Sequence, residues 1–571
     1  MSSAATLPAC LLRHARERPE DVALRKKDLG RWHEWTWAEY AQRVARVAAG
    51  LRACGVEPGD RVAIQSENRP EWLIADLAAQ AIGAIVVGIY PTSPAAELEY
   101  LMRHSGAKLL IAEDEEQADK ALAVRSDLPD LGELFVVDPR GVRSDAVRHW
   151  EELEGADPLD LEACAAELDA EATAIIVYTS GTTGPPKGAM LTHANMLYAA
   201  RIFRDAYGSS PADEVLSYLP LCHIAERLFS VLGALEAGYV VNFGAGGESF
   251  GADMREVQPT LFLGVPRVWE KMLASVEVRM ADASRAKRLA WRVALRSGGF
   301  LGYLLAFRAL REKLGLLRVR AAISGAAPIA PQVLEFFARI GVSVREGYGQ
   351  TEGTAVATAT PEDGIRIGTV GTALSDVELR VADDGEILVR SPGVFKGYFR
   401  DEEATAETID PEGWLHTGDV GELDADGYLT ITDRKKDIII TAGGKNISPS
   451  EIENKLKVSP YVREAIVVGD RRKYLTALIG IELDTVADWA GRRGVTFTTY
   501  GDLASKEQVR ELIGEWVERV NGELAQVERV KRFELLRKEL DHEDGQLTAT
   551  QKVKRAAISQ EFAEEVEALY R

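Results

Sequence analysis

Short runs of apolar, often β-branched residues alternate with helical patterns from about residue 50 to residue 400. The runs read RVAIQS, AIVVGIY, KLLIAED, ELFVVD, TAIIVYTS, VVNFG, TLFLGVP, VRAAISG and VSVREGYG. Runs of this kind predict buried strands, and the segments between them predict helices that cover both faces of parallel sheets. The sequence therefore predicts an α/β fold with parallel-rich, helix-covered sheets for this part of the chain.

The pattern changes at about residue 371. From there to residue 432 the apolar segments are short, and Asp-Gly pairs at 384–385 and 426–427 separate them. Because Asp-Gly favours two-residue hairpin turns, these segments predict a small antiparallel module.

A third pattern follows the stretch TDRKKD. The runs IIIT, EAIVVGD and LTALIGIEL mix with helical segments and predict a small α+β unit of about 135 residues. We therefore expect a large N-terminal domain over residues 1–432, a hinge over 433–437 and a small C-terminal domain over 438–571.

Composition narrows the function classes. A chain of 571 residues is too long for one core, and its formal net charge of −21 argues against a nucleic-acid partner. Its four cysteines are far apart, without the spacing of a disulfide framework or a zinc site, which is typical of a reducing compartment. We expect a cytoplasmic protein.

Two apolar segments need a separate interpretation. The first residues have too short an apolar run for a signal peptide. The longest apolar stretch, residues 72–90, contains Asp76, Gln80 and two glycines, so it predicts a helix followed by a strand rather than a membrane span.

The stretch YTSGTTGPPKG, residues 178–188, follows one of the predicted strands. Backbone N–H groups, hydroxyls and one ammonium in such a loop can surround a phosphate. The loop is not a Walker A motif, because Lys187 comes three residues after the second glycine and Gly188 stands where Ser or Thr is required. The candidate phosphate ligands are Thr179, Ser180, Gly181, Thr182, Thr183, Gly184 and Lys187.

Three further motifs are polar where a scaffold would be apolar. In EGYGQTEG, Tyr348 could stack on a base, Thr351 could bind a phosphate oxygen, and Glu352 could offer a carboxylate oxygen to Mg²⁺. GWLHTGD ends in Asp419, and a carboxylate is suited to a ribose diol. TATQKVKR supplies Lys552 near the C-terminus.

In this order the motifs resemble the adenylate-forming superfamily of acyl-CoA synthetases, firefly-type luciferases and peptide-synthetase adenylation domains. The resemblance covers nearly the whole chain. Within the superfamily, LPLCHIAER, VPRVWEKM, GGKNISPSEIE and LTATQKVKR are most similar to long-chain fatty acid CoA ligases.

The resemblance implies a reaction in two steps. A fatty carboxylate attacks the α-phosphate of MgATP to give acyl-AMP and pyrophosphate, and the thiol of coenzyme A then displaces AMP. The first step brings two anions together, so it needs cations and Mg²⁺ aimed at the developing charge rather than a nucleophilic side chain. ATP, Mg²⁺ and coenzyme A are the expected cofactors and co-substrates.

The resemblance also implies roles for single residues. The phosphate loop grips the β- and γ-phosphates, Thr351 contacts the α-phosphate, Glu352 binds Mg²⁺, and Lys552 contacts the carboxylate and bridging oxygen. The remaining nucleotide contacts are expected from Gly325, Ala326, Ala327, Tyr348, Gly349, Gln350, Asp419 and Arg434.

In such enzymes the C-terminal domain is a mobile lid. The resemblance places the pivot at Lys436, and it implies that rotation removes Lys552 and brings the Gly443–Gly444 loop to a channel for pantetheine. Gly349 and His223 are expected at the acyl site, although a structural role for His223 is nearly as plausible from the sequence.

Other interpretations stay open at this point. GESFG, residues 247–251, formally matches a nucleophile elbow with Ser249 and would indicate a serine hydrolase, but the glycine-rich stretch GAGG separates it from the preceding strand. A nucleotide-binding protein without turnover would not need Lys552. A fatty acyl-AMP ligase that omits the coenzyme A step is a third alternative.

Residues 284–320 are basic in an otherwise acidic chain, with ten Lys or Arg and one acidic residue, Glu312. Apolar residues mix with these cations at helical spacing, and Gly298, Gly299 and Gly302 are expected to divide the segment into two helices. The pattern is typical of an interfacial helix, so contact with an anionic membrane is predicted, with a scaffold helix pair as the equal alternative.

Overall fold

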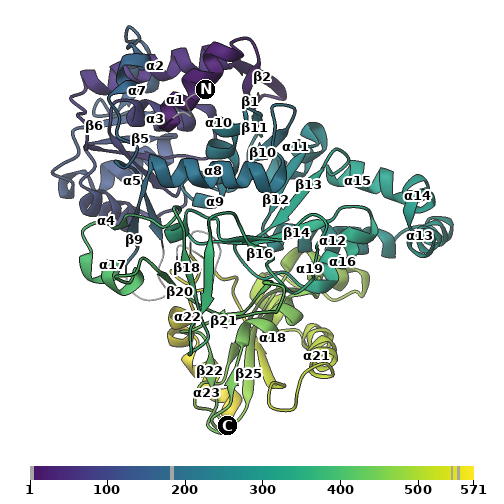
Figure 1. The fold of residues 1–571 in the computed structure, drawn as a ribbon. Coiled ribbons are helices and arrows are strands. Elements are labelled where there is room, and N and C mark those ends of the chain that lie inside the picture. The colour runs from purple at the N-terminus through teal and green to yellow at the C-terminus, as the bar shows by residue number, and fades with distance from the viewer. Residues whose placement is uncertain (1–4, 180–184, 542–543, 549–552) are drawn as a thin grey trace.

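The computed structural model describes residues 5–179, 185–541, 544–548 and 553–571. Figure 1 shows a broad N-terminal body of sheets and helices, a helical arm on one side of it, and a smaller C-terminal unit below it.

Each of the nine predicted strands is present. They are β3 (Arg61–Gln65), β4 (Ile85–Ile89), β5 (Leu109–Ala112), β6 (Glu133–Val136), β8 (Thr173–Thr179), β11 (Val240–Phe243), β12 (Leu261–Gly264), β13 (Ala321–Ser324) and β14 (Val344–Tyr348).

The widest sheet has the order β19-β9-β8-β4-β3-β5-β6-β7, with β9 (Lys187–Thr192), β19 (Gly397–Tyr398) and β7 (Arg148–His149) completing it. Its strands are parallel from β8 to β7, whereas β9 and β19 join antiparallel at one edge. Successive residues of β3 point to opposite faces: Val62 and Ile64 pack with α2 (Trp37–Ala53) and α3 (Pro70–Ala81), and Ala63 packs with α4 (Ala95–Ser105) and α5 (Glu115–Ala123). The predicted helix cover on both faces is confirmed.

Two more sheets complete the N-terminal body. One has the order β10-β11-β1-β2, in which β1 (Val22–Asp28) lies parallel to β11. Its other strands are β2 (Arg31–Thr36) and β10 (Glu214–Ser217). The other sheet has the order β12-β13-β14-β15-β16, with β15 (Thr358–Ala359) and β16 (Thr372–Ala373). The predicted strands did not include β1, β2 or β10.

The predicted antiparallel module is a four-stranded sheet, β17-β18-β20-β21. Its strands are β17 (Glu378–Val381), β18 (Glu386–Arg390), β20 (Leu415–Leu423) and β21 (Leu429–Arg434). The two Asp-Gly pairs lie in its hairpin turns, where Gly385 and Gly427 have φ of +85° and +81°. Such values favour glycine, which explains the sequence signal.

The C-terminal unit has its own core. A three-stranded sheet of β24 (Val462–Val468), β25 (Leu475–Ile481) and β26 (Val530–Leu535) packs against helices α18 (Pro449–Lys457) and α21 (Glu507–Asn521). A two-stranded hairpin, β22 (Ile439–Ile440) and β23 (Asn446–Ile447), precedes them. The remaining helices there are α19 (Leu483–Arg492), α20 (Tyr500–Ala504), α22 (Arg555–Glu561) and α23 (Ala563–Tyr570).

The basic segment forms a helical hairpin. Helix α13 (Arg285–Ser297) ends at Gly298 and Gly299, whose φ values of +55° and +48° reverse the chain. A second helix then runs through α14 (Gly299–Gly302), a π-helical segment η4 (Tyr303–Phe307) and α15 (Arg308–Leu314). The predicted division into two helices is therefore correct at the first two glycines but wrong at Gly302, which lies inside the second helix.

Over the described part of the chain, we find no helix with both the length and the apolar character needed to cross a bilayer.

Candidate active site

The strands that flank the phosphate loop hold its two ends together. Thr179, the last residue of β8, pairs with Lys187, the first residue of β9, and the Thr179 hydroxyl donates to the Lys187 carbonyl at 3.4 Å. The Tyr100 hydroxyl donates to the carbonyl of Pro186 at 3.1 Å from α4. Residues 180–184, which include five of the candidate phosphate ligands, lie outside the described residues.

Lys187 and Glu352 approach each other across one aromatic ring. The Lys187 ammonium lies 5.2 Å from the centre of the Tyr398 ring, and the Tyr398 hydroxyl donates to Glu352 Oε1 at 2.7 Å. Strand β19 places Tyr398 there by pairing with β9, with Tyr398 opposite Ala189. Burial raises the pKa of the Tyr398 phenol, and the Glu352 carboxylate raises it further, so this phenol stays a hydrogen-bond donor.

Asp419 is the centre of a second polar cluster. Its Oδ2 accepts hydrogen bonds from the Tyr348 hydroxyl and the Gln350 amide, both at 2.6 Å, and its Oδ1 accepts from Arg434 Nε at 3.0 Å. Asp419 is only 6 % exposed. Four residues predicted to contact the nucleotide thus converge, because β20 and β21 pair Asp419 directly with Arg434.

The two clusters are electrostatic neighbours. Tyr348 ends β14, and Glu352 follows four residues later in the short 3₁₀ helix Thr351–Gly353. Burial lowers the pKa of the Arg434 guanidinium, but the Asp419 and Glu352 carboxylates raise it by more. Lys187, which suits a phosphate, Glu352, which suits a metal ion, and Asp419, which suits a ribose, therefore lie around one site.

The loops around these clusters hold unusual backbone conformations. Ala326, Thr354 and Ala355 all have positive φ, at +67°, +53° and +64°. A side chain at Gly349 would collide with the backbone of Ala355, and one at Gly325 would approach the Gly347 carbonyl at 3.0 Å. Strained backbone of this kind is typical of functional sites, and the close approach brings the predicted Gly325–Ala327 loop next to Tyr348.

Glu352 fits a magnesium ligand of the kind that shares the ion with a substrate. Mg²⁺ is commonly held by one or two carboxylates together with phosphate oxygens and waters. Among the described residues, no group of three or more His, Cys, Asp or Glu side chains gathers as a closed metal site. Glu352 would therefore supply one oxygen, with the polyphosphate supplying others.

His223 caps the start of a short helix. Its Nδ1 accepts from the Ala225 N–H at 3.2 Å at the start of α9 (Ile224–Glu226). Next to it, burial raises the pKa of Glu226 to about 7, although Ser217, Ser230 and Leu219 all donate to this carboxylate. The cap shows a structural role for His223; its predicted contact with the acyl group stays a prediction.

The predicted hinge residues lie where the two units meet. The Lys435 N–H bonds to the Gly418 carbonyl, and its ammonium bonds to Asp384 and Glu386 of the antiparallel module, at 2.6 and 3.1 Å. Lys436 follows in an exposed turn. Asp437 has Arg555 of the C-terminal unit as an electrostatic neighbour.

The remaining C-terminal candidates are the Gly443–Gly444 pair and Lys552. Gly443 and Gly444 form the exposed turn of the β22–β23 hairpin, and a Cβ at Gly444 would meet nothing within 4 Å. Lys552 lies outside the described residues, while Leu547 and Val553 on either side of it form a β-bridge.

The contacts of Ser249 do not support a hydrolase. Its hydroxyl donates to the Gly246 carbonyl and the Asp253 carboxylate, so a carboxylate rather than a histidine is its side-chain partner in the described structure. The residue lies in a 3₁₀ turn six positions after β11 ends, whereas a nucleophile elbow needs the serine directly at the strand end.

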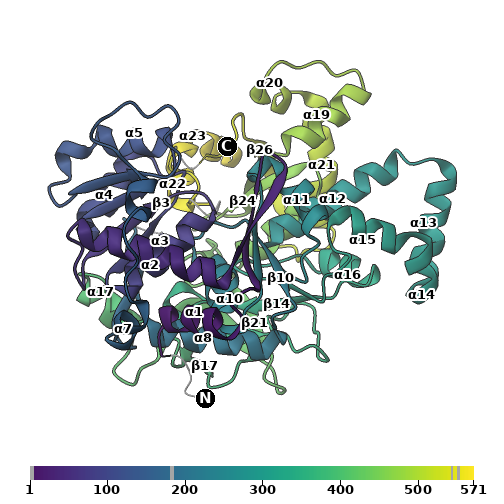
Figure 2. The same ribbon diagram turned by 90° about the horizontal axis from the view of Figure 1, so that it is seen from above.

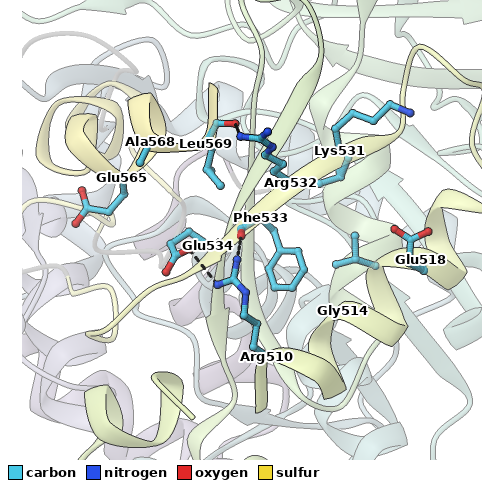
Figure 3. Close-up of a pocket in the computed structure, with 12 residues that line it drawn as sticks. Arg510, Gly514, Glu518, Lys531, Arg532, Phe533, Glu534, Glu565, Ala568 and Leu569 are labelled. Atoms are coloured by element: carbon cyan, nitrogen blue, oxygen red, sulfur yellow. Dashed lines mark hydrogen bonds and ion pairs between the residues drawn. The ribbon is translucent and has the colours of Figure 1, made fainter. Parts of the chain in front are cut away.

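A groove of about 730 Å³ lies in the C-terminal unit, between α21, β26 and α23 (Figure 3). Its arginines are engaged within that unit: Arg510 bonds to Glu534 and to the Phe533 carbonyl, and Arg532 bonds to the Leu569 carbonyl. None of the nucleotide candidates lines it.

Comparison with known proteins decides the family. Residues 11–399 match the family described as AMP-binding enzyme, and residues 436–571 match the AMP-binding enzyme C-terminal domain. The chain belongs to the AMP-binding enzyme family. The predicted superfamily resemblance and α/β fold are thereby confirmed.

Relatives of this AMP-binding enzyme match it over nearly its whole length. Long-chain-fatty-acid--CoA ligase FadD15 of Mycobacterium bovis is 35% identical, covering 98% of this chain and 96% of the relative. Long-chain-fatty-acid--CoA ligase ACSBG2 of Xenopus laevis is 31% identical, covering 96% and 81%.

Solved structures show the same fold. ATP-bound MatB from Rhodopseudomonas palustris has a TM-score of 0.73 at 26% identity, covering 98% of this chain and 99% of that one. The A domain of a carboxylic acid reductase from Segniliparus rugosus, in complex with AMP and a co-purified carboxylic acid, has a TM-score of 0.79 at 22% identity, covering 100% and 95%.

Proposed function

We propose that this AMP-binding enzyme activates a long-chain fatty acid with ATP and transfers the acyl group to coenzyme A, releasing AMP and pyrophosphate. The observation that carries the proposal is the buried Asp419 cluster beside the Lys187–Tyr398–Glu352 cluster. The full-length match to long-chain-fatty-acid--CoA ligases supports the choice of acid and thiol.

In the first half-reaction the fatty carboxylate forms a bond to the α-phosphorus while the bond from phosphorus to pyrophosphate breaks. The positions of Lys187 and Thr351 suit the β,γ-phosphates and the α-phosphate, and Asp419 suits the ribose hydroxyls as a double acceptor. Magnesium held at Glu352 would neutralise charge on the departing phosphates. The resemblance adds Lys552 at the carboxylate.

The nearby residues keep these groups separate before the nucleotide binds. The Lys187 ammonium lies over the Tyr398 ring, and the hydroxyl of that ring bonds to the Glu352 carboxylate. Cation and carboxylate therefore remain available to phosphate and metal instead of neutralising each other in a direct ion pair.

In the second half-reaction the coenzyme A sulfur forms the thioester bond and AMP leaves. We assign residues 1–432 to the large domain, 433–437 to the hinge and 438–571 to the lid, with the pivot at Lys436. The bonds of Lys435 to the large domain, followed by an exposed Lys436, support that pivot. Rotation there would bring Gly443 and Gly444 to the site and withdraw Lys552.

The proposal includes the place of action. A long-chain acid partitions into bilayers, so we propose a cytoplasmic enzyme in peripheral contact with the inner, anionic face of a membrane through residues 284–320. The reversed charge of that segment supports the contact.

The test follows each product separately. Purified protein with MgATP and a ladder of saturated acids should release pyrophosphate, and acyl-CoA should appear only when coenzyme A is added. Pyrophosphate release with acyl-AMP accumulation in the presence of coenzyme A would identify an acyl-AMP ligase instead. Nucleotide binding without pyrophosphate release for any acid would contradict the enzymatic proposal altogether.

A further inference from the structure

The hairpin of α13, α14, η4 and α15 projects from the N-terminal body in both views (Figures 1 and 2). Its two helices pack on each other: the rings of Trp291 and Phe307 are 5.9 Å apart, and Ala294 and Phe307 are fully or almost fully buried. Trp291 also meets Phe336 of α16 (Pro331–Arg339) at the base. The inner faces of the two helices are thus buried against each other, whereas their outer faces have no such packing within the hairpin.

These outer faces carry a concentration of exposed apolar side chains. Of the twelve large apolar residues that are exposed in the described structure, six lie in this hairpin. Phe300 at the turn is 78% exposed, and Leu304 in the second helix is 58% exposed. The other four are Leu289, Val293, Leu301 and Leu305. Single exposed apolar residues are ordinary, but a cluster at the end of a projecting element indicates an interaction surface.

The basic residues of the segment divide into two groups. Three of the ten cations belong to the scaffold: Arg318 pairs with Glu214, Arg320 with Asp213, and Arg311 donates to backbone carbonyls. The others have exposed side chains on the hairpin itself, and they are Arg285, Lys287, Arg288, Arg292, Arg296, Arg308 and Lys313. On α13, the cations at 285, 292 and 296 share the outer face with Leu289 and Val293 at the 3.6-residue period.

The mixture of cations and apolar groups selects the partner. A second copy of the chain would bring the same cations to the contact, and like charges repel. A bilayer with anionic headgroups offers phosphate oxygens to the arginines and an apolar layer just below them, so it satisfies both kinds of side chain at once.

We infer that the hairpin docks on an anionic lipid bilayer by inserting the turn and the exposed leucines that follow it, while the α13 cations contact the headgroups. The inference deepens the proposed function, since it specifies how the partner membrane is held. It can be tested without turnover, so failure of docking and failure of the ligase reaction are distinguishable.

The experiment is co-flotation of the full-length protein with phosphatidylcholine vesicles, with and without phosphatidylserine. Binding should require phosphatidylserine and weaken with salt without disappearing, because the inserted apolar groups are not screened. The insertion variant is Phe300→Ser with Leu301→Ser and Leu304→Ser. Its matched control is Leu29→Ser, which removes a 95% exposed leucine elsewhere.

The charge variant changes Arg285, Arg292 and Arg296 to Glu. Each lost cation should weaken partitioning about fivefold, so the triple variant should lose at least about 100-fold. Its control changes three exposed cations of other elements, Arg31, Arg52 and Lys531, to Glu, which alters the net charge equally and should leave most binding in place.

Several outcomes would overturn the inference. These are equal binding to neutral vesicles, binding that high salt abolishes completely, or unchanged binding of the insertion variant. Sedimentation velocity adds one more: a wild-type dimer that the insertion variant dissociates would assign the face to a second copy. Acyl-CoA formation from detergent-dispersed acid, measured in parallel, should be the same in all variants.

Discussion

The two halves of the proposed active site are built in opposite ways. In the N-terminal body, Asp419 is buried, accepts three hydrogen bonds and is fixed by neighbouring strands. In the C-terminal unit, the Gly443–Gly444 turn is exposed, and the units are joined across α12 (Pro266–Ala281) and α19 by ion pairs of Arg267 with Glu482 and of Arg492 with Asp282.

This difference matches what each half has to do. Nucleotide contacts serve both half-reactions, so they gain from preorganised, buried groups. Under the proposed roles the C-terminal groups serve one half-reaction each, and a unit held in part by an exposed ion pair such as Arg492–Asp282 can change its orientation at small free-energy cost.

The comparison is sharpened most by Lys552→Ala. If this lysine acts only in the first half-reaction, acyl-AMP formation should fall by about 10²- to 10³-fold, as for loss of one preorganised charged donor. Thioester formation from supplied acyl-AMP should be nearly unchanged. The two rates are measured separately, and an equal loss in both would place the lysine in a shared role.

Substitution of the proposed pivot should have the reverse effect. Lys436→Pro fixes φ near −65° and restricts Lys435, so only one lid orientation remains accessible. Adenylation should stay within a few-fold of wild type while thioester formation falls by about tenfold or more. Lys435→Ala, which keeps backbone freedom, is the matched control. Unchanged thioester formation in Lys436→Pro would move the pivot elsewhere.

Loss of charge at Asp419 should weaken both half-reactions through the nucleotide. Asp419→Asn removes charge-assisted bonds from Tyr348 and Arg434, and bonds of this kind correspond to about a 10- to 100-fold change in KM for ATP. Steady-state kinetics on each half-reaction provide the measurement. A decrease confined to thioester formation would contradict the assignment of this residue to the nucleotide.

Reversal of an exposed inter-unit pair should have a smaller effect. Arg492 bonds to both carboxylate oxygens of Asp282, at 2.6 and 2.8 Å, so Arg492→Glu should slow adenylation by about two- to fivefold. The swap Asp282→Arg with Arg492→Asp should restore the rate, and Arg493→Glu is the neighbouring control. If the swap fails to rescue, the pair does not hold the lid.

The smallest effect concerns pH and a half-buried carboxyl in the nucleotide half, that of Glu346. Burial raises the pKa of Glu346 to about 7 from an ordinary value of 4.5. The folded state therefore binds an extra proton between these values. The contribution of this group to stability is fully present below pH 4.5 and is lost as the pH rises through 7.

Glu346→Gln should flatten that decline by about a few degrees in melting temperature and should raise the melting temperature at pH 8. Glu226, whose pKa is also about 7, gives the same trend, so part of the slope should remain. Differential scanning fluorimetry across pH measures both, and an unchanged slope would contradict the raised pKa of Glu346.

The sequence predicted what short segments determine. Runs such as AIVVGIY became buried parallel strands, and Asp-Gly pairs became hairpin turns, because period and turn chemistry are local.

The sequence did not predict contacts set by tertiary pairing. Tyr398 reaches Glu352 only because β19 joins the edge of a sheet whose other strands come from a distant part of the chain. The positive φ values of Ala326, Thr354 and Ala355 have no local signal, since alanine and threonine disfavour that region and only the surrounding packing imposes it. The prediction of a helix break at Gly302 is wrong, because this glycine instead lets the two helices of the hairpin pack closely.

Gly302 limits how this sequence can diverge. A Cβ at this position would lie 2.6 Å from the Phe307 ring and 2.8 Å from the Ala294 carbonyl, so even alanine would push the two helices apart. The loss of stability would be confined to the hairpin, because the nucleotide clusters share no contact with it in the described structure. Among related chains, a larger residue at the equivalent of Gly302 should therefore coincide with a differently packed or missing hairpin, while the AMP-binding motifs are unchanged.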